Sequence, residues 1–313
     1  MISPPVTDAA RLLFSIFVAD LLPIFVIAGV GFLLGRYATV DVRTVSRITF
    51  HAFAPALVFN LLVTSTLGGL AFGRMALFYL MVATSAGLMA RVAAIPLRLD
   101  RPALSAFVLV VMCSNSGNYG LPVTLLAFGR EALTYAGVYF LSSATFSYTG
   151  GVLLAASGRR SLPDAIRGVA RVPAIYAAAA AIMLWIGLPV PAWVMQPVTM
   201  MSEASLPLMI VVLGMQLERA TWPERPIVVA LAVALSLVAT PLAALGIAHL
   251  LGLHGPALQA GVLQASMPSA VIATILALEF DAAPNFVTSV VAVSTLLSPL
   301  TLTIVIAFLQ HAA

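Results

Sequence analysis

One stretch of eight residues in an apolar part of the chain carries most of its polar chemistry. Residues Asn115 to Pro122 read Asn-Ser-Gly-Asn-Tyr-Gly-Leu-Pro between apolar flanks. Two glycines, a proline and two asparagines are poor helix formers, so the backbone there is expected to unwind. Freed backbone N–H and C=O groups in an apolar environment are costly unless they face a polar cavity or a ligand. The stretch therefore predicts a polar binding site.

A weaker version of the same pattern lies farther along the chain. Gln264, Ser266, Pro268 and Ser269 interrupt another apolar run. If both segments break where they cross, each following half-helix aims unpaired N–H groups and its positive dipole end at the break. Such ends attract anions, whereas the carbonyl-rich ends could hold a cation. The competing interpretation is a pair of kinked helices whose amides bond to neighbouring helices.

A few ionisable or reactive residues lie within or beside apolar blocks. His51 and Glu203 are inside such blocks, where ionisable groups are candidates for ion or proton coupling. Each is near an expected helix end, so a side chain that reaches the membrane interface is the competing interpretation. Asp20 and Glu279 are expected at the interfaces, in contact with solvent. The single cysteine, Cys113, excludes an intrachain disulfide and is expected to be a small apolar core residue.

Composition defines the class of protein. Of 313 residues, 62% are hydrophobic and 8% are charged, whereas soluble domains have about 25% charged residues. The apolar residues form blocks long enough to cross a hydrocarbon core about 30 Å thick as helices. The formal charge is +4, but all 15 basic residues are arginines scattered between apolar blocks. This scatter argues against nucleic acid as a partner and favours an all-α, polytopic membrane protein in a lipid bilayer.

Ten candidate membrane spans follow from the apolar blocks. They cover residues 18–36, 45–66, 72–95, 104–128, 132–157, 173–188, 195–217, 227–251, 256–279 and 284–309. Loops rich in arginine stay in the cytoplasm, and in this arrangement twelve of the 15 arginines fall on one side. Only Arg11, Arg74 and Arg130 fall on the other side. We read the arginines as topology markers and expect a multi-pass protein of the cytoplasmic (inner) membrane with both termini outside.

The most polar segment divides the chain into two halves. Residues 1–157 form the first predicted five-helix repeat, residues 158–172 a cytoplasmic linker, and residues 173–313 the second repeat. Because each half has an odd number of spans, the halves insert with opposite orientation, which is typical of transporters. Pro55 and Pro207 are 152 residues apart in similar contexts, and the same offset relates Pro268 to Ser116. The two predicted breaks therefore occupy corresponding places in the two halves.

With these features, the sequence resembles the auxin efflux carrier family. The resemblance covers nearly the whole chain and depends on the order and spacing of several segments. These are LLPIFVIAGVGFLLGR in the first span, FHAFAPALVFNLL in the second, NSGNYGLPV in the fourth, EASLPLMIVVLGMQL in the seventh and ASMPSAVIATILA in the ninth.

This resemblance implies a fold similar to that of bile acid sodium symporters. In that fold two inverted five-helix repeats have broken fourth and ninth helices that cross in a mobile core, beside a scaffold that is often a homodimer. By position, the substrate-binding residues would be Asn115, Ser116, Gly117, Asn118 and Pro122 at the first crossover, and Ser266, Met267, Pro268 and Ser269 at the second.

The resemblance also implies a carrier of small organic anions such as auxin or dicarboxylates. The chain lacks the long central loop of plant efflux carriers and their Asn-Pro-Asn motif at the crossover. These differences favour a malonate- or malate-like acid over auxin as the substrate. The expected mechanism is alternating access. No phosphate-binding loop is present, so transport would be secondary, and proton coupling, sodium coupling and uniport stay open. No cofactor is expected.

The alternatives to a transporter are an intramembrane enzyme and a membrane sensor or solute-binding protein. An intramembrane metalloprotease needs His-Glu-x-x-His, which is absent, and the four histidines are widely separated, so neither an enzyme nor a metal site is expected. A Gly-x-Ser-x-Gly nucleophile motif is also absent. A membrane sensor or solute-binding protein without transport is the main alternative, although the sequence shows no cytoplasmic signalling domain.

Overall fold

The structure is a computed structural model that describes residues 4–38, 40–65, 67–155, 170, 172–184, 190–219 and 225–312. The described residues are helical, and their only β-type contact is an isolated bridge between Ser114 and Ser269. The prediction of an all-α protein is therefore confirmed for this part of the chain. Most of the predicted linker, residues 158–172, lies outside the described residues.

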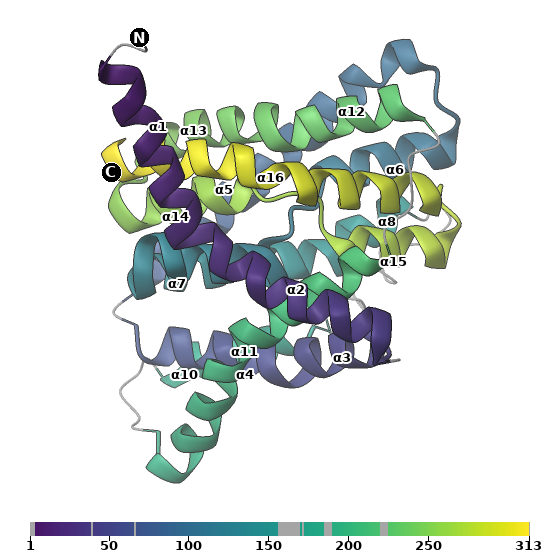
Figure 1. The fold of residues 1–313 in the computed structure, drawn as a ribbon. Helices are drawn as coiled ribbons and strands as arrows, with labels where there is room; N and C mark the ends of the chain where they lie inside the picture. The colour runs from purple at the N-terminus through teal and green to yellow at the C-terminus, as the bar shows by residue number, and fades with distance from the viewer. Residues whose placement is uncertain are drawn as a thin grey trace.

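The N-terminal half consists of long helices interrupted by short π-helical turns (Figure 1). In order these are α1 (Pro4–Ile16), η1 (Phe17–Leu21), α2 (Leu22–Tyr37), α3 (Val42–Ile48), η2 (Thr49–Phe53), α4 (Ala54–Val63), α5 (Gly69–Ala93), the 3-10 turn η3 (Ile95–Leu97), α6 (Arg101–Met112), η4 (Ser116–Gly120), α7 (Leu121–Phe146), η5 (Ser147–Gly151) and α8 (Val152–Ala155).

The C-terminal half is built in the same way. Its elements are α10 (Pro173–Leu184), α11 (Ala192–Glu218), α12 (Pro226–Ala234), η6 (Leu235–Ala239), α13 (Thr240–Leu250), α14 (Gly255–Ala265), α15 (Val271–Phe280) and α16 (Pro284–Ala312).

Four of the π turns have a common cause in the sequence. Pro23, Pro55, Pro122 and Pro241 each stand two residues after the last residue of a π turn. A proline has no N–H to donate, and its ring clashes with the carbonyl of the preceding turn. Widening that turn to π geometry relieves the clash while the helix continues across the membrane. These prolines therefore bend the spanning helices without ending them.

Several helices are suited to a bilayer. In the described part of the chain, seven helices are long and apolar enough to cross a membrane, and three shorter apolar helices cover Arg101–Met112, Pro173–Met183 and Val271–Phe280. Large apolar side chains such as Val26, Leu80 and Leu242 are exposed on the outer surface, as expected of helices that face lipid. The protein is thus a polytopic membrane protein, while the count of ten spans and the inverted repeat remain predictions.

The longest helix is in fact two helices joined at one glycine. Gly129 in α7 has φ +78° and ψ −170°, a conformation that is essentially restricted to glycine. The segment before it, residues 121–128, is the second half of the fourth predicted span, and the segment after it continues into η5 and α8 as the fifth. Gly129 therefore makes the sharp turn between two successive helices without an extended loop.

Helices α2 and α11 pack so closely that their backbones touch. A Cβ atom added to Gly31 would lie 2.0 Å from the carbonyl oxygen of Val211, and one added to Gly214 would lie 1.8 Å from that of Ala28. Small residues at such positions allow the van der Waals packing that drives helix association in membranes. Ser205 Oγ also donates to the carbonyl of Phe53 at 2.9 Å, which ties α11 to η2. We call α2, α4 and α11 the frame.

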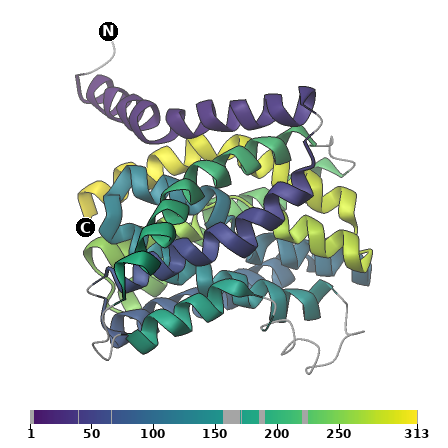
Figure 2. The same cartoon turned by 90° about the horizontal axis from the view of Figure 1, so that it is seen from below.

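The two described chain ends lie at the same end of the molecule. Figure 1 shows N and C on the left and the labels of α3 and α15 toward the right, and Figure 2 again shows both ends on the left. We call these the terminal end and the α3 end. Termini on one side agree with an even number of crossings, but which side faces the cytoplasm remains a prediction.

Candidate functional site

Two broken helices cross in the middle of the molecule. Helix α6 ends at Met112 and η4 begins at Ser116, while α14 ends at Ala265 and α15 begins at Val271. The extended segments between them run antiparallel. The amide of Asn115 donates to the carbonyl of Pro268 at 2.7 Å, and the amide of Ala270 donates to the carbonyl of Cys113 at 2.7 Å. These bonds satisfy backbone groups that would otherwise be left unpaired inside the protein. We call this pair of bonds the clasp.

The residues of the second break mainly hold the crossover together. Ser269 Oγ donates to the carbonyl of Val110 at 2.7 Å, and the Ser269 amide donates to Ser294 Oγ at 3.2 Å. Ser266 Oγ donates back to the carbonyl of Val262 at 2.7 Å.

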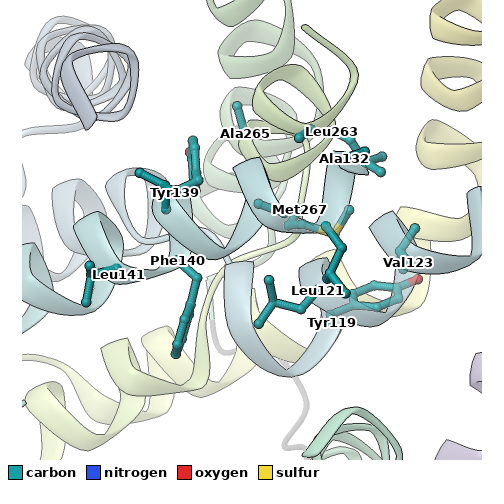
Figure 3. Close-up of a cluster of buried hydrophobic side chains, with 14 of the residues drawn as sticks. Tyr119, Leu121, Val123, Ala132, Tyr139, Phe140, Leu141, Leu263, Ala265 and Met267 are labelled. Atoms are coloured by element: carbon teal, nitrogen blue, oxygen red, sulfur yellow. The ribbon is translucent and has the colours of Figure 1, made fainter. Parts of the chain in front are cut away.

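Met267 is fully buried in an apolar cluster with Tyr119 and Leu121 (Figure 3). None of the four predicted residues 266–269 lines the central cavity described next, and neither does Pro122.

A cavity of about 690 Å³ extends from the crossover to the α3 end. Its walls come from α3 and η2, from residues 114–118 at the first break, and from α7, η5, α11, α15 and α16. Four of the predicted site residues, Asn115, Ser116, Gly117 and Asn118, line its inner end. The structure therefore brings the first-break residues to one cavity and leaves the second-break residues behind it.

Two side-chain amide atoms in the cavity wall have no hydrogen-bond partner among the described residues. Asn115 is 5% exposed, and its Nδ2 donor has no hydrogen-bond partner within the described residues. Gln216 Oε1 on α11 is likewise buried and without a partner there. Unpaired buried amide atoms cost about 1–3 kcal/mol each unless water or a ligand satisfies them. Both atoms are thus available to a molecule held in the cavity.

Helix ends add positive electrostatic potential at the same place. The helical segment that begins at Ser116 and helix α15, which begins at Val271, both start at the crossover, and both residues line the cavity. The first amides of a helix have no intrahelical acceptor, and its N-terminus carries a partial positive charge. Together with Asn115 Nδ2, these ends favour an anionic group.

The outer part of the cavity is rich in basic residues. Arg43, Arg47 and Arg219 line it, as does His51, whereas Glu279 is the one acidic residue in its lining. Clefts lined by charges of one sign concentrate ligands of the opposite sign. The arginines that we interpreted only as topology markers thus include three that form the mouth of the cavity.

Asp41 begins helix α3 beside this mouth. Its carboxylate accepts hydrogen bonds from Thr44 Oγ1 at 2.7 Å and from the Thr44 amide at 3.1 Å. The Thr44 hydroxyl hydrogen bond is the main cause that holds the pKa of Asp41 below its usual value, and the charge of Arg219 acts in the same direction. This cap fixes the first turn of the helix that carries Arg43 and Arg47.

The two residues proposed for coupling are not brought together. His51 lines the cavity, with Nδ1 3.0 Å from the carbonyl of Arg47. Glu203 is exposed on α11 and does not line the cavity. A proton relay between the two therefore has no support in the described residues.

Sequence reasoning missed several cavity residues and misplaced one acid. Arg43 and Arg47 were missed. Together with the candidate His51 they are spaced by four residues and share one face of a helix, and that spacing was the available signal. Gln216 gave no local signal. Asp20 was expected in contact with solvent, but the structure buries it to 9% exposure, which corrects that expectation.

Apolar helices around a polar, basic cavity are the architecture of a membrane transport protein. The sequence profile of the family described as "Membrane transport protein" matches residues 16–165 and again residues 157–306. The chain therefore belongs to this family, the auxin efflux carrier family. It is also 29% identical over 288 residues to an "Uncharacterized transporter" of Methanothermobacter thermautotrophicus, covering 88% of this chain and 93% of that protein.

Proposed function

We propose that the protein is a secondary carrier that moves a small organic anion across the cytoplasmic membrane. The observation that carries this proposal is the single cavity joining the crossover amides to a mouth lined by Arg43, Arg47 and Arg219. The arginines attract an anion to the mouth, and the helix N-termini and Asn115 Nδ2 favour it at the crossover. A cavity of about 690 Å³ is within the usual size range of small-molecule sites.

The charge of the lining favours a particular class of substrate. Three arginines and one glutamate give the cavity an excess of positive charge, which suits a compact dianion better than a monoanion with a large apolar ring. We therefore favour a malonate- or malate-like dicarboxylate over an auxin-like acid. Arginine forms bidentate hydrogen bonds with carboxylates, so Arg47 and Arg219 would capture such an acid at the mouth before it reaches the Asn115 amide.

Alternating access is the proposed mechanism. Because the backbones of α2 and α11 are in contact, the frame would act as one rigid body. Helices α6, α7, α14 and α15 are joined through the clasp and would move together as a core. Shifting the core along the frame would close the α3 end and open the terminal end, with the anion carried at the crossover. In the present conformation the cavity extends to the α3 end, which we assign to the cytoplasm from the distribution of arginines.

Inverted repeats underlie this proposal. Ser205 and Phe53 are in contact and are separated by the same 152 residues that relate Pro207 to Pro55. Contact between equivalent positions is expected where a two-fold axis relates two halves. The antiparallel clasp between the two breaks has the same character. These contacts support two inverted halves. That both termini lie outside the cell is proposed from the distribution of arginines. Whether the frame forms a homodimer, and whether H⁺ or Na⁺ drives transport, are left to experiment.

The test is uptake of labelled organic acids into proteoliposomes. Purified protein would be reconstituted, and malonate, malate and indole-3-acetate would be supplied with no gradient, a pH gradient or a sodium gradient. We expect saturable uptake of a dicarboxylate that unlabelled dicarboxylates inhibit. Liposomes with Asn115→Ala protein at equal density provide the control. If wild-type protein moves none of these acids above the level of empty liposomes, the proposed function is wrong.

A further inference from the structure

Asp20 is the one buried residue among the charged side chains that the structure describes. It lies in the π turn η1, within the first apolar span Ala10–Tyr37. Its neighbours one helical turn away, Ile16 and Ile24, are 4% and 0% exposed. Asp20 is therefore an acid within an apolar helix stripe that faces the protein interior. Figure 2 shows the bend of the N-terminal helix at this place, between α1 and α2.

The surroundings of Asp20 offer no counter-charge. The turn η1 packs against α1, α2, α7 and α16. The titratable side chains that the structure describes on these elements are Arg11, Arg36, Tyr37, Arg130, Glu131, Tyr135, Tyr139 and His311. The four basic ones are exposed, and Arg36 pairs with Glu218 at 3.6 Å. No side chain in the described part of the chain lies within hydrogen-bond or ion-pair distance of the Asp20 carboxyl.

A lone buried carboxyl has two very different states. A carboxylate without a partner is costly in an apolar environment, which favours the neutral acid. Once water reaches it, the proton can leave and the charged form becomes stable. Ionisable residues inside membrane spans are commonly functional.

Asp20 lies at the boundary between the frame and the core. It directly precedes α2 of the frame, and η1 touches α7 and α16 on the other side. Phe25 of α2 packs edge-on against Tyr119 of η4, with ring centroids 6.1 Å apart. Asp20 comes before Phe25 in a helix that begins at the terminal end, so it lies beyond that contact, away from the cavity that reaches the α3 end.

We propose that Asp20 is a proton-binding site that controls opening of this boundary at the terminal end. In the closed state the boundary covers the neutral acid, and opening hydrates the carboxyl so that the proton passes to water. Low pH on the terminal side then favours the conformation described here, and high pH favours opening. The proposal rests on the alternating access proposed above, but the proton site itself can be tested without a substrate.

Two substrate-free measurements test the site. Infrared spectra of purified protein at neutral pH should contain the C=O band of a protonated, non-hydrogen-bonded carboxylic acid, and Asp20→Asn should remove that band. Glu203→Gln, which changes an exposed acid on another spanning helix, should leave it in place. Hydrogen–deuterium exchange of the η1 amides, corrected for intrinsic rates, should rise with pH in the wild type and stay flat in Asp20→Asn. A band and a pH response that survive in Asp20→Asn would overturn the proposal.

A second variant covers the case in which Asp20→Asn does not fold. Asp20→Leu places an apolar side chain between Ile16 and Ile24 and should keep the η1 amides protected at every pH. In proteoliposomes, the uptake rate of either variant should lose its dependence on the pH of the terminal side. Loss of the infrared band with no uptake by the wild type would reject the carrier function and retain the proton site. Uptake by the wild type with the same pH profile in both variants would reject the proton site alone.

Discussion

The backbone amide of Asn115 donates to the carbonyl of Pro268 at 2.7 Å, although the two residues belong to opposite halves of the chain. This hydrogen bond uses a main-chain atom of Asn115 and not its side chain. The side-chain Nδ2 has no hydrogen-bond partner among the described residues. Pro268 has no backbone N–H to donate, but its carbonyl oxygen accepts this hydrogen bond. The pair thus holds the crossover with backbone atoms and leaves a side-chain donor for the cavity.

The first prediction concerns the asparagines at the crossover. Asn115→Ala and Asn118→Ala should each reduce organic-anion uptake by at least about tenfold, because one hydrogen bond to a charged group contributes about 1.5–3 kcal/mol. The measurement is initial uptake rate in proteoliposomes at matched protein density. Gln310→Ala, which removes an exposed amide near the C-terminus, is the control. Equal rates in both asparagine variants and the wild type would remove the site from the crossover.

The second prediction concerns the basic mouth of the cavity. Arg47→Gln and Arg219→Gln should raise the KM for the anion severalfold while changing the maximal rate less, since they act on capture of the substrate. The effect should shrink as salt is added, because salt screens exposed charges. Arg91→Gln, an exposed arginine outside the cavity, should leave KM unchanged. An Arg91→Gln effect as large as the other two would point to general surface charge instead.

The third prediction concerns the frame. Gly31→Ala should destabilise the folded protein by about 1–3 kcal/mol, since overpacking at a tight contact forces backbones apart and the new methyl would meet the Val211 carbonyl. Gly29→Ala, two residues away with open space around it, is the matched control and should be neutral or slightly stabilising. Thermal unfolding of both variants in the same detergent decides the matter. A Gly31→Ala protein as stable as the control would contradict the backbone contact.

The fourth prediction concerns the turn within α7. Gly129→Ala should cost about 1–3 kcal/mol, because its φ of +78° lies in a region that alanine scarcely occupies. The comparison is Gly246→Ala in α13, where the backbone is helical and nothing lies within 4 Å of the new methyl. That change should stabilise by up to about 1 kcal/mol. Equal melting temperatures for the two variants would show that the turn relaxes without strain.

The fifth prediction concerns pH at the start of α3. Because folding lowers the pKa of Asp41, mainly through the Thr44 hydroxyl, the charged cap stabilises the helix at neutral pH. This contribution should disappear as pH falls through the lowered pKa, below the usual range of aspartate. Exchange of the Thr44 amide, corrected for its intrinsic rate, should increase over that range. Asp41→Asn can cap without charge, so its exchange should not respond; a response of equal size there would exclude Asp41 as the cause.

Much of the fold could be predicted because bilayer length and proline chemistry act locally. In the described part of the chain, seven long apolar helices and three shorter ones overlap the predicted spans, and the breakers around Asn118 do interrupt the helix. The first span was placed too late, since α1 begins at Pro4, because its early residues are less apolar than the bilayer criterion requires. Gly129 was read as loop, whereas a single non-helical residue makes the whole turn.

The site was only partly predictable because it depends on contacts between distant segments. Residue types identified Asn115 and Asn118, but nothing local distinguishes Ser269, which bonds Val110 behind the crossover, from a residue that faces the cavity. Composition alone also cannot tell an arginine that marks topology from Arg219, which lines the mouth. Burial of Asp20 follows from packing of η1 against α7 and α16, and the sequence of one helix does not contain that information.

The clasp is made of main-chain atoms alone, so it does not depend on which side chains stand at its positions. Any residue except proline at positions 115 and 270 supplies the same N–H, and any residue at 113 and 268 supplies the same carbonyl. Natural selection can therefore exchange the side chains around the cavity without breaking the backbone hydrogen bonds that hold the crossover together. One architecture can in this way acquire new cargoes by substitutions at a few neighbouring positions.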